Sequence, residues 1–208
     1  GKVMRWGDDN GGDFDFAQGD PALQPPLSAG EIKLTRTSFL NGSRPFEIGD
    51  VHFFAVVSVQ DIPGPPGEIK EIMSIGNLRI AIKEGRITFT AGSYSTSPYY
   101  LADNENILME VRASRNERSL RIRINGYPEI EMDDQFLYAL SSQAPILGGN
   151  ILSASTTFRE IIAFYETLPS TVRNTLVARM ISDHSLNMPT LPPAPPVYPD
   201  TDGDEMPD

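Results

Sequence analysis

Four aspartates near the end of the sequence have the spacing of a small calcium-binding loop. They occupy relative positions 1, 3, 5 and 9 of one segment, as Asp200, Asp202, Asp204 and Asp208. Gly203 allows a sharp turn between them. Carboxylates this close together repel one another unless a cation joins them. All the ligand atoms are oxygen and no Cys or His lies nearby, so we expect the cation to be Ca²⁺. The alternative is a solvated acidic tail without a metal.

The calcium prediction also indicates a location. Single-loop sites of this kind bind Ca²⁺ with dissociation constants of about 10⁻⁴ to 10⁻³ M, so they are filled outside cells rather than in the cytosol. We therefore expect an extracellular or cell-surface protein, with a virion as the alternative. Residues 200–208 resemble the aspartate-rich thrombospondin type 3 repeats of modular surface proteins.

A second, weaker cation site is predicted near the start of the sequence, where Asp8, Asn10 and Asp13 stand among glycines. Asp and Gly also crowd simple turns for conformational reasons, so a turn without a metal is the alternative. Asn41 opens an Asn-Gly-Ser sequon, which predicts N-glycosylation if a glycosylating host exports the chain.

One acidic segment has the spacing of a glycosidase site. Glu129, Glu131 and Asp133 alternate along a predicted strand, so their carboxylates share one face and could supply a nucleophile and an acid. We favour a solvated acidic strand face, because a chain with one Trp shows little sign of an aromatic cleft for sugars. The only histidines form no triad pattern: His52 should be a hydrogen-bonded sheet histidine, and His184 should lie at the negative end of a helix dipole. We therefore expect no enzyme activity.

Composition narrows the range of partners. With 17 basic against 28 acidic side chains and a formal charge of -11, the average surface repels phosphate backbones, so we expect no nucleic-acid partner. Cysteine is absent, which excludes disulfides and thiolate metal sites. No apolar run is long enough to predict membrane insertion.

Five arginines crowd one predicted hairpin: Arg112, Arg115, Arg118, Arg121 and Arg123. Arg121 and Arg123 are two residues apart on one strand and therefore share a face. One interpretation is a cationic stripe for an acidic glycan or for a neighbouring acidic subunit, with the chain's own tail as a candidate. The other is an ordinary outward sheet face, because Leu120, Ile122 and Ile124 already explain the alternation.

Period-two alternation predicts the elements that carry these residues. The segment 51–59 is apolar on both faces and should be a central, buried strand. Further strands are predicted over 31–36, 69–75, 77–83, 86–91, 106–113, 119–125 and 158–165. Val172, Leu176 and Met180 predict one short helix after Pro169, packed against a sheet edge or end. The order predicts an all-β fold, a two-sheet antiparallel jelly-roll sandwich with one short C-terminal helix and an extended Pro-rich tail.

The composition changes near residue 187. We expect one jelly-roll domain over 1–187, a Pro-rich linker over 188–199 and the acidic calcium-binding tail over 200–208. About 11 residues in the polyproline II conformation reach about 34 Å, which is enough to carry the tail onto a neighbouring subunit.

Four segments, in this order, resemble the laminin G-like, concanavalin A-type lectin/glucanase jelly rolls of bacterial and phage surface proteins. They are Trp6 with the turns of 8–13, strand 51–57, strand 120–126 with its Asn-Gly turn, and strand 158–165 with the helix that follows it. The resemblance implies a two-sheet sandwich in a family of mostly binding, adhesion or structural modules. Glucanases of this fold use Glu-x-Asp-x-Glu, whereas 129–133 reads Glu-x-Glu-x-Asp.

We therefore expect a non-enzymatic extracellular structural or adhesive module that self-assembles as a homo-oligomer or filament. The residues predicted to lie at its interface are Arg121 and Arg123 and, separately, the apolar tail residues Leu191, Val197 and Tyr198. A calcium-dependent carbohydrate-binding lectin, with surface glycans as ligands, is the second possibility. A glycoside hydrolase is the third.

The calcium prediction is tested by titrating Ca²⁺ into the full chain and into an Asp202→Ala, Asp204→Ala variant. We expect binding heat with the unsubstituted chain, a much weaker response with Mg²⁺, and loss of the Ca²⁺ response in the variant, because an irregular all-oxygen loop suits the larger ion. Equal, negligible heats from both chains would remove the site.

Overall fold

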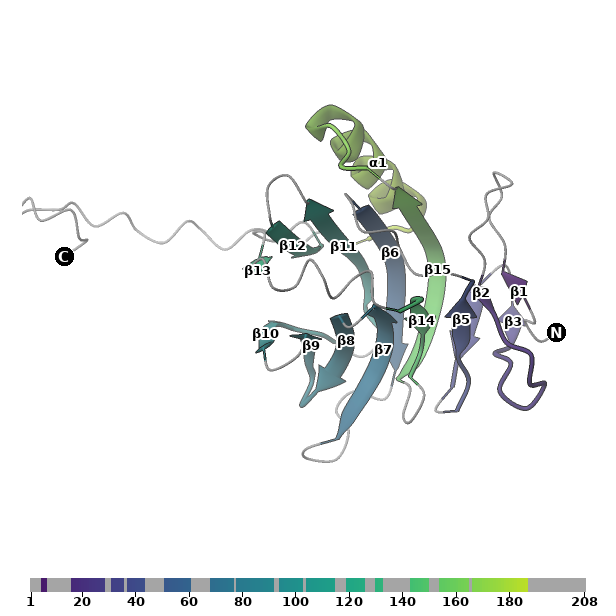
Figure 1. Cartoon of the computed structure of the whole chain (residues 1–208). Coiled ribbons are helices and arrows are strands. Elements are labelled where there is room, and N and C mark those ends of the chain that lie inside the picture. Colours follow the sequence, from purple (N-terminus) through teal and green to yellow (C-terminus); the bar gives the residue numbers. More distant parts are fainter. Residues whose placement is uncertain are drawn as a thin grey trace, which may run out of the picture.

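The computed structural model describes residues 5–6, 16–28, 31–35, 37–43, 51–60, 68–76, 78–91, 94–102, 104–114, 119–125, 130–132, 143–149, 154–164 and 166–186. Within these ranges the chain forms two antiparallel sheets and one helix (Figure 1). This confirms the predicted all-β jelly-roll sandwich with a single short helix.

The first sheet has eight described strands. In spatial order they are β1 (Arg5–Trp6), β2 (Phe16–Ala17), β5 (Leu40–Gly42), β14 (Ile146–Leu147), β7 (Ile69–Ile75), β8 (Leu78–Lys83), β9 (Arg86–Ala91) and β10 (Tyr94–Tyr100). The second sheet has seven described strands. They are β13 (Ile130–Met132), β12 (Ser119–Ile124), β11 (Asn106–Ser114), β6 (Val51–Gln60), β15 (Ser155–Phe164), β4 (Glu31–Leu34) and β3 (Leu27–Ser28).

Strand β6 lies at the centre of the seven-stranded sheet, between β11 and β15. Its first nine residues are buried, so both of its faces are covered, as its uninterrupted apolar character predicts. One face points into the sandwich and the other points outward, because side chains alternate along a strand.

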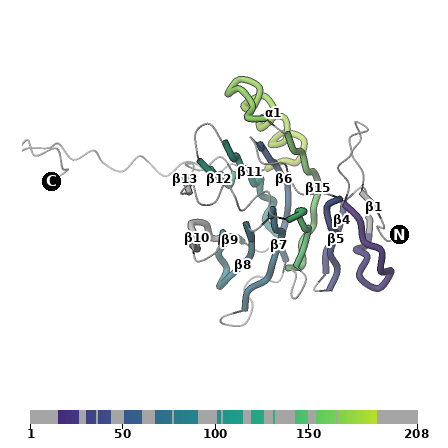
Figure 2. The backbone as a smooth tube through the Cα atoms, in the orientation of Figure 1, coloured from purple at the N-terminus to yellow at the C-terminus, as the bar shows by residue number. Residues whose placement is uncertain are grey.

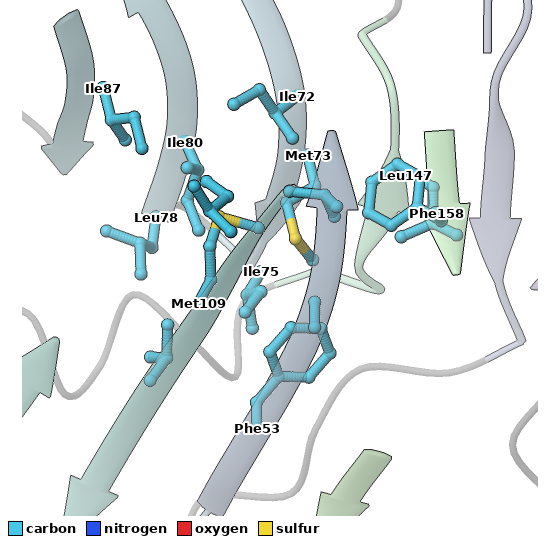
Figure 3. Packing of buried hydrophobic residues seen from close by; sticks show 14 of the residues in the cluster. Phe53, Ile72, Met73, Ile75, Leu78, Ile80, Ile87, Met109, Leu147 and Phe158 are labelled. Carbon is cyan, nitrogen blue, oxygen red and sulfur yellow. The ribbon is translucent and has the colours of Figure 1, made fainter. Parts of the chain in front are cut away.

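The main core fills the space between the two sheets. Phe53 and Met109 of the seven-stranded sheet lie beside Ile72 and Ile80 of the eight-stranded sheet, and all four are fully buried (Figure 3). Each side chain of this size contributes about 1.5–3 kcal/mol when it leaves water. The core therefore joins the two sheets directly and needs no disulfide.

The long strands follow the predicted ranges closely, and the differences lie at their ends. β15 begins at Ser155 rather than at 158, and β4 ends at Leu34 rather than at 36. The prediction did not include β10 or the short strands β5 and β14. Two or three residues carry no periodic pattern, and β10 contains Pro98, which argues against a strand in a sequence.

Helix α1 (Ser170–Asp183) follows β15 and packs on the outward side of the seven-stranded sheet (Figures 1 and 2). It buries Val177 and Met180 against outward-facing residues of β6 and β11, which form a second apolar cluster: Phe54, Val56 and Leu108. The prediction that the helix packs against a sheet edge or end therefore needs correction, because β6 and β11 are interior strands of the sheet. Among the described residues, no helix has the length and hydrophobicity needed to cross a bilayer.

The packing of α1 gives a direct test. Met180 is fully buried in the second cluster, so Met180→Ala should lower the free energy of unfolding by about 2–5 kcal/mol in urea titrations followed by circular dichroism. Val172 lies on the same helix but is 49% exposed, so Val172→Ala should change stability by no more than about 0.5 kcal/mol. Similar effects from both substitutions would contradict the observed orientation of the helix.

Candidate functional site: the outer face of the seven-stranded sheet

The outward-facing side chains of β6, β11, β12 and β13 form regular cross-strand rows. In one row, His52 lies opposite Arg112, Arg112 opposite Arg121, and Arg121 opposite Glu131. In the next row, Phe54 lies opposite Glu110, and Glu110 opposite Arg123. The residues between them along each strand point into the main core, so alternation alone brings these charged groups to one outer face.

Three side chains from three elements form a closed charge cluster on this face. His52 Nε2 is 2.8 Å from Glu110 Oε1, and Arg173 Nε on helix α1 donates to the same oxygen at 2.9 Å. A second guanidinium nitrogen of Arg173 contacts Glu110 Oε2. The His52 ring stacks on Phe54 with ring centroids 4.5 Å apart. We call His52, Glu110 and Arg173 the N-terminal clasp, because Arg173 lies in the first half of the helix.

The N-terminal clasp keeps Glu110 ionised despite its burial. Burial alone would raise the pKa of this carboxyl, but the hydrogen bonds from His52 and Arg173 and their positive charge outweigh burial and lower the pKa to about 2. An ionised carboxylate can only accept hydrogen bonds, so the proton between the two residues lies on His52 Nε2. Both Glu110 oxygens are therefore engaged in holding the helix.

A second cluster anchors the other end of α1. Arg179 contacts Glu160 of β15, and His184, the residue that caps the helix, places Nε2 2.8 Å from Glu160 Oε2. We call Glu160, Arg179 and His184 the C-terminal clasp. The two clasps share one design: a sheet glutamate accepts from one helix arginine and from one of the two histidines of the chain.

The described arginines of the predicted stripe lie beside the N-terminal clasp. We call Arg112, Arg121 and Arg123 the arginine face; all three are half-buried on the outer face of β11 and β12. Arg121 forms a long ion pair of 3.8 Å with Glu131, whose side chain is 63% exposed. This ion pair therefore lies at an exposed edge of the sheet, whereas the clasp beside it is buried.

The clasp geometry does not suit acid–base catalysis. A general base needs access to the proton that it abstracts, but the side chains of His52 and Glu110 are only 2% and 6% exposed. Within the described ranges, no three His, Cys, Asp or Glu side chains converge in a way that would hold a metal ion. Guanidinium groups in general can recognise carboxylates and other anions.

Several predicted site residues lie outside the described residues. They are Asp8, Asn10, Asp13, Asp200, Asp202, Asp204, Asp208, Leu191, Val197 and Tyr198. The calcium sites and the tail interface therefore stay predictions. Asn41 lies in β5 with an exposed side chain, and its glycosylation likewise stays a prediction.

The structure describes one member of the predicted glycosidase triplet. Glu131 lies in β13, an edge strand, and faces Arg121, whereas Glu129 and Asp133 lie outside the described residues. The position of Glu131 agrees with a solvated strand face. His52 and His184 occupy the predicted environments, a hydrogen-bonded sheet position and a helix C-terminus.

Sequence reasoning did not find the acidic residues of the clasps or their helix partners. Glu110 contacts residues 58 and 63 positions away, so no local motif marks the N-terminal clasp. One signal was available: Glu110 interrupts the apolar run of 107–111, and a charge in a strand buried on both faces must find a partner.

No protein-family model and no curated protein matches this chain. Its fold is similar to that of solved structures. Trypanosoma rangeli sialidase in complex with sialic acid matches with a TM-score of 0.67 and 10% identity, over 90% of this chain and 32% of that chain. The botulinum neurotoxin serotype D binding domain matches with a TM-score of 0.62 and 11% identity, over 86% of this chain and 51% of that chain. The serotype G binding domain gives 0.55 and 16%, over 82% and 45%.

These similarities establish the fold, and the chain spans about a third of the sialidase and about half of the toxin binding domains. At identities this low, the similarity of fold gives no information about the function of the residues on the outer face, because function depends on the residues of a site and not on the fold.

The N-terminal clasp makes the free energy of unfolding depend on pH over a defined acidic range. Because the pKa of Glu110 is lowered from 4.5 to about 2, its contribution is fully present above pH 4.5 and is lost as the pH falls towards 2. This contribution is on the order of 3 kcal/mol. In urea titrations across this window, Glu110→Gln should be less stable at neutral pH and should lose less stability on acidification.

Glu166→Gln is the control for this prediction, because Glu166 is an exposed glutamate in the connection between β15 and α1. The free energy of unfolding of this variant should fall on acidification in the same way as that of the unsubstituted chain. If Glu110→Gln loses as much stability on acidification as the unsubstituted chain, the clasp does not hold an ionised Glu110.

Proposed function

We propose that this chain is a non-catalytic adhesive module of an extracellular or cell-surface protein. The observation that carries the proposal is the sealed state of its buried acid–base pair. Among the described residues, His52 and Glu110 are the natural candidates for catalysis. Their side chains are buried, however, and Arg173 donates hydrogen bonds to Glu110 that hold helix α1 on the sheet. The charge interactions of the N-terminal clasp therefore fix the position of the helix.

A rigid platform suits recognition rather than turnover. The sandwich core joins the two sheets, and α1 is tied to the outer face by the second apolar cluster and by both clasps. Binding surfaces held on such a scaffold lose little conformational entropy when a ligand binds. The Pro-rich linker and the acidic tail would connect this platform to neighbouring subunits, and Ca²⁺ would order the tail.

Carbohydrate binding is the second candidate function. It is supported by the structural similarity to a sialidase that was solved with sialic acid and to two toxin binding domains. The arginine face offers guanidinium groups that match the carboxylate of an acidic sugar. In this case the chain would be a lectin, with Ca²⁺ in a supporting role.

The test separates binding from hydrolysis on the same substrates. We expect the full chain to release neither reducing sugar from β-glucans nor sialic acid from sialylated glycans. Binding of the chain to the same glycans, immobilised on a surface, is measured in parallel. Glu131→Gln and Glu110→Gln should leave this zero rate unchanged. Measurable sugar release that disappears in either variant would overturn the proposal and assign the chain to the glycoside hydrolases.

A further inference from the structure

We propose that a polar site centred on Arg159, on the outer face of the seven-stranded sheet, binds an acidic sugar residue of a glycan. The inference rests on the proposed adhesive function and names a site and a ligand class through which the module adheres. The site shares no residue with the two clasps or with the arginine face.

The base of the site is a row of polar residues that crosses four strands. Asn106 of β11 lies opposite Ser58 of β6, Ser58 opposite Thr157 of β15, and Thr157 opposite Lys33 of β4. The row faces outward, because neighbouring strand residues such as Val57 point into the main core. Helix α1 covers the adjoining part of this face, and the row lies outside the second apolar cluster (Figure 1).

Two hydroxyl groups in this row lie in buried residues and have no partner in the protein. Ser58 is 6% exposed and Thr157 is 7% exposed. Neither hydroxyl forms a hydrogen bond within the described part of the chain. Polar groups of buried residues are nearly always hydrogen-bonded, so these two hydroxyls indicate a partner that the described chain does not supply.

A β-bulge brings a guanidinium to the same place. The pairing of β15 with β6 shifts between Phe158 and Glu160, so Arg159 is an extra residue without a strand partner. Bulges re-aim the side chains that they carry and are common next to active sites. This bulge puts two successive residues on the outer face: Glu160 contacts Arg179 of the helix, and Arg159 turns to the polar row.

Arg159 is held in position from two sides. Its Nε donates to Asn106 Oδ1 on β11 at 3.1 Å, and its Nη1 contacts Glu31 on β4. Because β6 lies between β15 and β11, the side chain reaches across the strand that carries Ser58. These contacts leave Nη2 of Arg159 without a partner among the described residues. A side chain fixed in this way loses little conformational entropy when a ligand binds.

The groups at the site define the chemistry of the ligand. Arg159 Nη2 and the exposed ammonium of Lys33, which has no ion pair within the described ranges, are charged donors for a carboxylate. The hydroxyls of Ser58 and Thr157 and the amide of Asn106 suit sugar hydroxyls, which both donate and accept. A ligand with one carboxylate and several hydroxyls uses all of these groups, whereas a neutral sugar leaves both cations unused.

The test measures the binding of two acidic oligosaccharides, oligogalacturonate and sialyllactose, to the full chain by isothermal titration calorimetry. Their uncharged counterparts, methyl-esterified oligogalacturonate and lactose, are titrated in parallel. We expect an acidic probe to bind, and its counterpart to bind at least about tenfold more weakly, because the counterpart has no carboxylate for Arg159.

Two substitutions separate binding from folding. Arg159→Gln should weaken binding of the acidic probe at least about tenfold, because a charged donor is lost. Thr157→Val keeps the side-chain shape and removes a hydroxyl that has no protein partner. It should leave the free energy of unfolding in urea unchanged or raised and weaken binding about 2- to 10-fold, the effect of one hydrogen bond.

Thr156→Val is the matched control for Thr157→Val. Thr156 lies next to Thr157 on β15 but lies opposite Val59, whose side chain points into the main core, and its hydroxyl donates to the Ala154 carbonyl at 3.2 Å. This variant should be less stable and should bind the acidic probe as the unsubstituted chain does. Circular dichroism verifies folding, and Thr157→Val decides the test if Arg159→Gln does not fold.

Three results would overturn the proposal. Absence of binding of both acidic probes at millimolar concentration removes the site. Equal binding of an acidic probe and its counterpart removes the recognition of the carboxylate. Binding that is abolished by Arg121→Gln with Arg123→Gln, and unchanged in Arg159→Gln and Thr157→Val, assigns acidic sugars to the arginine face. None of these results affects the hydrolysis test, so the adhesive proposal stands or fails separately.

Discussion

The burial of β6 on both faces is the constraint on which the rest of the structure depends. Its inward face requires a second sheet, and its outward face requires a cover, which α1 supplies through the second apolar cluster. A central strand with a polar residue on its covered face must also provide that residue with a partner. His52 therefore requires Glu110 on the next strand, and Glu110 requires Arg173 on the helix.

This chain of requirements explains why the helix has one position on the sheet. An apolar patch alone allows a helix to slide or rotate, because hydrophobic contact has no direction. The two clasps fix both ends of α1, since each glutamate accepts from an arginine at a defined place on the helix. Both clasps thereby set the register between helix and sheet, because each joins one strand position to one helix position.

The long strands and the helix could be predicted from the sequence, because period-two alternation and four-residue apolar spacing are local signals. The strand 51–59 and the helix after Pro169 illustrate this. The helix packing surface could not be predicted, since it depends on the cross-strand register that places Leu108 opposite Val56. The clasps were missed for a related reason, as strand register and the packing of α1 on the sheet together bring their members into contact. Outward placement of the arginines was predicted, but the direct opposition of Arg112 and Arg121 required the register.

The sheet edges limit how copies of this fold can meet. In the described part of the chain, three of the four edge strands, β1, β3 and β13, have only two or three residues, so they offer little backbone for another strand. The fourth, β10, contains Pro98, which lacks a backbone donor, and its pairing with β9 is irregular at that point. Edge-to-edge pairing is therefore disfavoured at the edge strands that the structure describes. With a net charge of -11, copies also repel one another overall.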